Sequence, residues 1–98
     1  MNTNKYKYEF MGIIKPFLPE EVRIKFFEDT RKLIEGEGGK IINEDIWGKR
    51  HLAYKIKEHE EGYYFVYTLE IEAGKLQKIH RELKMTNDLL RYIIIKGD

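Results

Sequence analysis

The strongest chemical signal in the sequence is a run of basic residues between positions 49 and 57. The run holds four cations, one histidine and no acidic residue: Lys49, Arg50, His51, Lys55 and Lys57. Trp47 precedes it and Tyr54 lies within it. Guanidinium and ammonium groups beside stacking rings are typical of contact with a nucleic-acid backbone and with unpaired bases. A second explanation stays open, because edge strands also carry cations to prevent edge-to-edge aggregation.

Residue types that carry catalysis or bind metals are scarce. The absence of cysteine excludes disulfides, thiolate metal sites and cysteine nucleophiles, and the absence of serine excludes a serine triad. The three histidines share no metal-ligand spacing: His51, His59 and His80. The glycine-rich segment 36–39 lacks the phosphate-loop motif, and the acidic segment 58–61 lacks the ligand spacing of a calcium loop. No residue stands out as a catalyst, and we expect no metal site and no cofactor.

Length and charge narrow the class of protein. We expect one domain over residues 1–98, because 98 residues leave no room for a second core. No apolar run approaches the roughly 20 residues that span a bilayer, so we expect no membrane partner and a cytoplasmic location. The 18 basic and 17 acidic residues leave a net charge of +1, so no overall field attracts nucleic acid. Binding that neutralises few phosphates is weak. We therefore expect an isolated monomer that binds RNA weakly.

The hydrophobic pattern predicts four strands and two helices. Alternating residues, rich in aromatic and β-branched types, predict strands at 5–14, 40–57, 63–71 and 89–96. Apolar residues at helical spacing predict helices at 19–35 and 75–85. Pro19 suits the first position of the first helix. We expect a bend or bulge at Gly48 and a polar turn at 58–61.

The order of these elements, β-α-β-β-α-β, predicts an α+β fold of the ferredoxin-like class. Its four-stranded antiparallel sheet has the spatial order 4-1-3-2, with both helices on one face. The second strand, which carries the basic run, then lies at an edge of the sheet. Because this fold hosts many unrelated functions, the function must be argued from particular residues.

An RNA-recognition motif shares the same order of elements and is a competing interpretation. Residues 61–68 match part of the octapeptide of that module, which would expose Tyr63 and Phe65 on the open face of the sheet. The same alternation continues into further apolar residues, which indicates a helix-covered core instead. We expect Tyr63, Phe65, Tyr67 and Leu69 to face the helices, together with Phe26, Leu33 and Ile79.

The segment Trp47–Ile56, WGKRHLAYKI, resembles the W-G-[KR]-R-x-L-A-Y-x-I motif of the bacterial small-subunit ribosomal protein six (S-six) family. Tyr8-Glu9 with the later Pro16 is similar to the opening strand of that family. Residues 61–64, 81–83 and 90–96 also fit its hairpin, second helix and last strand. The resemblance covers nearly the whole chain.

This resemblance implies a structural ribosomal protein with the ferredoxin-like fold, and not an enzyme. The family binds the central domain of small-subunit ribosomal RNA together with small-subunit ribosomal protein eighteen. Arg50 matches the fixed arginine of the motif, Lys49 its basic neighbour, Arg91 the basic position that opens the last strand, and Lys7 a basic position before the Tyr-Glu pair. With the basic run, the candidates for RNA or partner binding are Lys7, Lys49, Arg50, His51, Lys55 and Arg91. The alternative is a ligand-binding or enzymatic ferredoxin-like module whose open sheet faces pair into a dimeric barrel.

Overall fold

The computed structural model of the chain describes residues 4–97. Its strands and helices are β1 (Lys5–Ile14), α1 (Glu20–Gly36), β2 (Lys40–Ile56), β3 (His59–Glu72), α2 (Leu76–Lys84) and β4 (Leu89–Lys96). A short 3₁₀ turn, Ala73–Lys75, leads into α2. Among the described residues, no helix has the length and apolar character that crossing a membrane requires.

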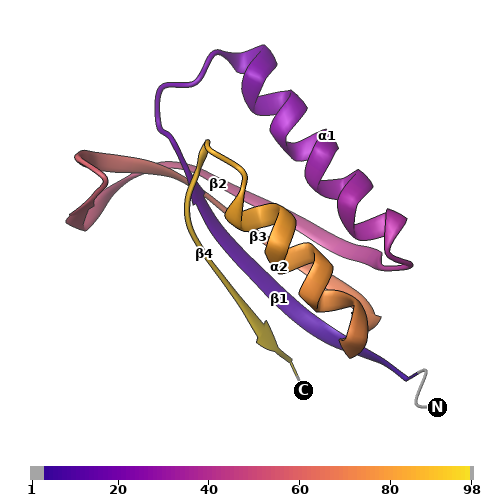
Figure 1. Cartoon of the computed structure of the whole chain (residues 1–98). Coiled ribbons are helices and arrows are strands. Elements are labelled where there is room, and N and C mark those ends of the chain that lie inside the picture. Colours follow the sequence, from indigo (N-terminus) through magenta and orange to yellow (C-terminus); the bar gives the residue numbers. More distant parts are fainter. Residues whose placement is uncertain (1–3, 98) are drawn as a thin grey trace.

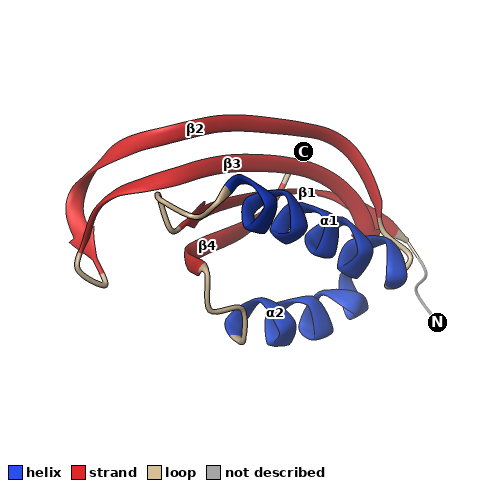
Figure 2. Cartoon of the chain, turned by 90° about the horizontal axis from the view of Figure 1, so that it is seen from above, coloured by secondary structure: helices blue, strands red, loops and turns tan. Residues whose placement is uncertain are grey.

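The four strands form one antiparallel sheet in the order β2-β3-β1-β4. Both helices lie on the same face of this sheet, and the other face is uncovered (Figures 1 and 2). The predicted order of strands and the predicted edge position of β2 are therefore confirmed. β4 forms the opposite edge.

The first helix begins directly after a proline. Pro19 was predicted to be the first helical residue, but it stands at the N-cap, one position before the helix begins at Glu20. Its carbonyl accepts hydrogen bonds from the backbone N–H groups of Val22 and Arg23. Glu20 and Glu21 occupy the first turn, where carboxylates favour the positive end of the helix dipole. The short loop 37–39 then connects the end of α1 to the long strand β2.

The core lies between the central strands and the helices. Phe65 and Tyr67 are fully buried and pack edge-to-face against Phe10, with ring centroids 5.3 and 6.2 Å away. The predicted inward set is confirmed: Phe26, Phe65, Tyr67, Leu69 and Ile79 are buried, while Tyr63 and Leu33 pack at the margin. Burial of Phe65 against the helices excludes the RNA-recognition motif, which needs that ring on the open face.

The turn between β2 and β3 differs from the prediction. The structure has a two-residue turn, Lys57 and Glu58, and β3 already begins at His59 rather than at residue 63. Both turn residues have positive φ angles, 48° and 70°, as a mirror-image hairpin turn requires. The polar turn expected at 58–61 was wrong because Lys-Glu gives no sign of such a turn, which usually carries Asn-Gly or Asp-Gly.

Candidate nucleic-acid interface

The basic run lies on a hairpin that extends past the helices. In Figure 2, the ends of β2 and β3 that meet at the Lys57–Glu58 turn curve away beyond α1 and α2. The curvature has a local cause. The pairing with β3 shifts between Ile46 and Gly48, and Gly48 takes a φ of 85°, which favours glycine. The bulge expected at Gly48 is therefore present, and it lies directly before the basic run.

Neighbouring cations of the run point to opposite faces of the sheet. Lys49 stands opposite Tyr63, which packs on the helix side, whereas Arg50 stands opposite Gly62. A Cβ atom added to Gly62 would meet Ile13, which lies on the open side. Directly opposed residues share a face, so Arg50 belongs to the open face and Lys49 to the helix side. His51, opposite Glu61, follows Lys49.

Two further candidates join Arg50 on the open face. Arg91 stands opposite Ile13, and it lines a cavity of about 360 Å³ together with Lys55. Sequence alternation groups Lys55 with Lys49 and His51, but the structure separates them. The reason is that the pairing of β2 with β3 is interrupted after His51, so strict alternation no longer holds.

Lys7 lies apart from the other candidates. It stands opposite Glu70, whereas Ile13, the β1 neighbour of Arg91, stands opposite Tyr64. Six residues of strand separate Lys7 from Ile13, which is about 20 Å at the rise of an extended strand. Any contact made by Lys7 is therefore independent of the hairpin.

Two further residues, Phe17 and Arg23, lie on the same side of the hairpin as Lys49 and were not predicted from the sequence. The Lys49 ammonium lies 4.5 Å from the ring centre of Phe17, which is 71% exposed. The Arg23 guanidinium lies 4.7 Å from the ring centre of Tyr63. Phe17 and Arg23 come from the loop after β1 and from α1, so only the folded chain places them beside β2. No spacing in the sequence could have identified them.

The cations of the hairpin are largely free of acidic partners. Lys55 lies 3.9 Å from Glu60, and both side chains are well exposed, so this pair contributes little. Arg50 donates a hydrogen bond to the backbone carbonyl of Lys49. Within residues 4–97, Lys49, Arg50 and Arg91 form no ion pair. These charges therefore remain available for an external anion.

The open face of the sheet presents an apolar band. Met11 stands opposite both Val66 and Ile93, and Ile95 follows Ile93 along β4. Trp47 lies parallel to the ring of Tyr64, with centroids 6.3 Å apart, on the same face. Met11, Ile93, Ile95 and Trp47 are all exposed. Contiguous exposed apolar surface marks sites of contact with other molecules.

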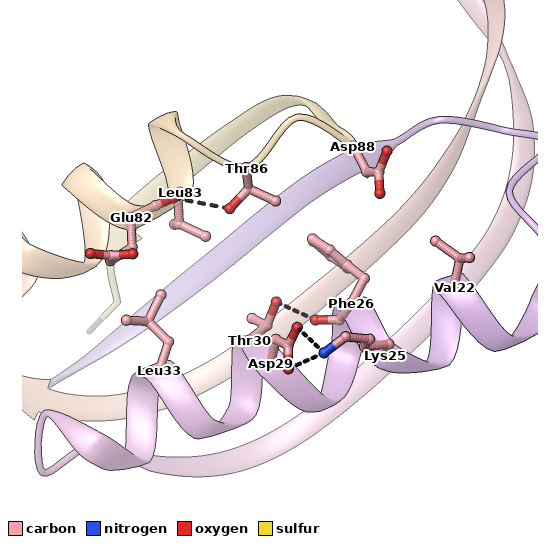
Figure 3. Close-up of a pocket in the computed structure, with 10 residues that line it drawn as sticks. All are labelled: Val22, Lys25, Phe26, Asp29, Thr30, Leu33, Glu82, Leu83, Thr86 and Asp88. Carbon is pink, nitrogen blue, oxygen red and sulfur yellow. Dashed lines mark hydrogen bonds and ion pairs between the residues drawn. The ribbon is translucent and has the colours of Figure 1, made fainter.

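A second cavity, of about 450 Å³, lies between the two helices (Figure 3). Several of its polar side chains already have partners: Lys25 and Asp29 form an ion pair of 3.2 Å, and the Thr30 hydroxyl donates to the Phe26 carbonyl. Asp88 pairs with Lys15. Among the residues described, no group of three or more His, Asp or Glu side chains is placed to hold a metal ion.

The sheet topology and the two helices on one face define a ferredoxin-like domain, from which a basic hairpin projects. The family model of ribosomal protein S6 matches residues 7–96. The chain therefore belongs to the ribosomal protein S6 family.

Individual relatives agree with this assignment. The chain is 43% identical over 91 residues to the small ribosomal subunit protein bS6 of Thermoanaerobacter pseudethanolicus, which covers 93% of this chain and 96% of the relative. It is 39% identical over 92 residues to the protein of the same name from Carboxydothermus hydrogenoformans, with 94% and 96% covered. The crystal structure of 30S ribosomal protein S6 from Thermotoga maritima superposes with a TM-score of 0.90 at 33% identity, covering 95% of this chain and 88% of that one.

The resemblance noted in the sequence is thus confirmed. The S6 family consists of structural ribosomal proteins, so the chain is not an enzyme, and the enzymatic alternative is excluded.

Proposed function

We propose that this chain is a structural protein of the small ribosomal subunit in the cytoplasm, where it binds the central domain of the ribosomal RNA together with small-subunit ribosomal protein eighteen. The observation that carries the proposal is the basic hairpin. It projects beyond the helices at a sheet edge, and its cations have few acidic partners. The relatives named as small ribosomal subunit proteins support the same location.

The RNA contact is assigned to both sides of the hairpin. Arg50, Lys55 and Arg91 offer cations on the open side, and Lys49 with Arg23 offers them on the helix side. An arginine can hold a phosphate through two parallel hydrogen bonds, whereas a lysine acts as a point charge. An RNA backbone that passes the edge of the sheet can thus be held from two sides.

The partner protein is assigned to the apolar band of the open face. Met11, Ile93 and Ile95 are exposed there, and a protein partner would remove them from water. The net charge of +1 supports the need for such a partner, because a chain that neutralises few phosphates binds RNA weakly. The isolated chain is proposed to be a monomer with low affinity for RNA.

The test is the double charge reversal Lys49→Glu with Arg50→Glu. Both side chains are exposed, so the free energy of unfolding should change by no more than about 0.5 kcal/mol. Each reversal replaces an attraction toward phosphate with a repulsion, so assembly with protein eighteen and central-domain RNA should weaken at least about tenfold. Binding is measured for the ternary assembly and, separately, for protein eighteen alone.

A matched control is Lys32→Glu with Lys84→Glu, which makes the same change in net charge on the exposed helix surfaces. A control that weakens assembly equally would show that only net charge matters. A hairpin variant that folds and assembles like the wild type would remove the basic run from the interface and leave it as a device against aggregation. Weakened binding to protein eighteen without RNA would assign these cations to the protein partner.

A further inference from the structure

The cavity beside Arg91 exists because the pairing of β2 with β3 is interrupted near the hairpin turn. His51 stands opposite Glu61 and Ile56 opposite His59, so residues 52–55 face the single residue Glu60. Backbone groups in this segment of β2 are released from regular pairing with β3. The extra residues make β2 bulge, and the cavity forms over the open face of the sheet.

The lining of this hollow combines three kinds of surface. Its apolar lining includes Ile13, Leu52 and Ile56, and its two cations are Lys55 and Arg91. Its aromatic residues are Tyr54 and Tyr64. The volume of about 360 Å³ is at the lower end of the range for ligand pockets, which suits one flat ring system better than a large ligand.

Tyr54 plays no visible part in the core. Its side chain is 84% exposed, so the ring contributes little to folding and remains available for stacking. Aromatic side chains next to cations are the usual means of holding a base together with its phosphate. Because β2 is an edge strand, its outward backbone groups can donate or accept hydrogen bonds at the edge of a base. An apolar peptide side chain would contact the apolar lining but would use neither the cations nor these backbone groups.

We propose that this cavity receives one unpaired base of RNA, with the base stacked on Tyr54 and the adjoining phosphate held by Arg91 and Lys55. The proposal deepens and rests on the proposed RNA-binding function, because it names the part of an RNA that the hairpin recognises. Every base has a face that can stack, so the cavity selects an unpaired nucleotide rather than a particular sequence.

The experiment uses the full chain and two RNA duplexes at low ionic strength. One duplex carries a single bulged adenosine, and the other carries an abasic nucleotide at the same position, so that the phosphates are identical. The wild type should bind the adenosine duplex about 5- to 150-fold more tightly, which is the range for one stacked base. Tyr54→Ala should abolish this preference, and Tyr54→Phe, which keeps the ring, should retain it.

Met85→Ala is the matched control, because it removes another exposed large side chain at the end of α2, outside the lining of the cavity. It should keep the preference for adenosine, and loss of the preference in this variant would overturn the proposal.

Equal binding of the two duplexes by the wild type would overturn the base cavity while leaving RNA binding in place. Failure of both duplexes to bind, with the Lys49→Glu, Arg50→Glu variant assembling normally, would overturn the proposed function and the cavity with it. Weaker binding of Tyr54→Ala to protein eighteen without RNA would assign the cavity to the protein partner and overturn the nucleotide site.

Discussion

Alternate residues of the same strands form the two faces of the sheet, and the two faces have different roles. On the helix-covered face, Phe10, Phe65 and Tyr67 are no more than 1% exposed. On the open face, Ile93 and Ile95 are more than half exposed. Burial of a large apolar side chain contributes about 1.5–3 kcal/mol, so the first face holds the fold together. The second face contributes little to stability, and its residues are available to other molecules.

The largest expected effect is the replacement of a ring on the covered face. Phe65→Ala should lower the free energy of unfolding by about 3–5 kcal/mol, because it removes a buried ring and leaves a cavity among Phe10, Phe26 and Phe27. The matched change on the open face, Ile93→Ala, should cost about 1 kcal/mol or less. Chemical denaturation of both variants measures the difference. Equal losses in the free energy of unfolding would contradict the conclusion that the covered face, and not the open face, stabilises the fold.

A smaller effect is expected where the covered face has no side chain at all. A Cβ atom added to Gly12 would overlap the ring of Phe65, which lies over this glycine. Gly12→Ala should therefore cost about 1–3 kcal/mol through overpacking.

The matched control for Gly12→Ala is Gly36→Ala at the end of α1, where a Cβ atom has open space. There the substitution should be neutral or stabilise the chain by up to about 1 kcal/mol, since alanine favours the helix. Thermal unfolding of the two variants decides the comparison. If the two alanines have the same effect, close packing of Phe65 on Gly12 is not what sets the cost.

The covered face could be read from the sequence, because its period-two pattern of large apolar residues runs through β3 without a break and through β1 with Gly12 as the one interruption. Burial enforces that pattern, since a slip of one residue would expose the whole apolar set. The prediction that Phe65, Tyr67 and Leu69 face the helices was therefore correct. The basic run on β2 was identified from its charge pattern, and the resemblance to the family matched Lys49 and Arg50 within it.

The hairpin end could be predicted only in part. Alternation predicted Lys49, His51 and Lys55 on one side, but the interruption after His51 places Lys55 with Arg91 in the cavity. This exposed segment buries no large set of apolar side chains, so the hydrophobic pattern gives no sign of the interruption in strand pairing. Arg23 was missed for a different reason: its contact with Tyr63 depends on how α1 packs, and not on any spacing within the chain.

The smallest expected effect concerns a polar atom on the covered face. The hydroxyl of Tyr67 is buried and makes no well-formed hydrogen bond among residues 4–97, and the side chains of Arg31 and Glu44 are its charged neighbours. Burial raises the pKa of Tyr67 to about 12, and Glu44 adds to this rise while Arg31 partly opposes it. A tyrosine in the unfolded chain ionises near pH 10, whereas the folded one keeps its proton until about pH 12. The stability that Tyr67 contributes is therefore complete below pH 10 and is lost as the pH rises toward 12.

Tyr67→Phe tests both the missing partner and the titration. At pH 7 the free energy of unfolding should stay within about 1 kcal/mol of the wild type or rise slightly, because the variant no longer buries an unpaired hydroxyl. Between pH 10 and 12 the variant should lose less stability than the wild type, and the difference between the two curves isolates Tyr67 from Tyr92, whose pKa burial also raises. Denaturation curves at pH 7, 10 and 11.5 provide the measurement. A loss above about 1 kcal/mol at pH 7 would mean that the hydroxyl has a partner in the folded protein, since removing one member of a buried hydrogen bond carries a cost of that size.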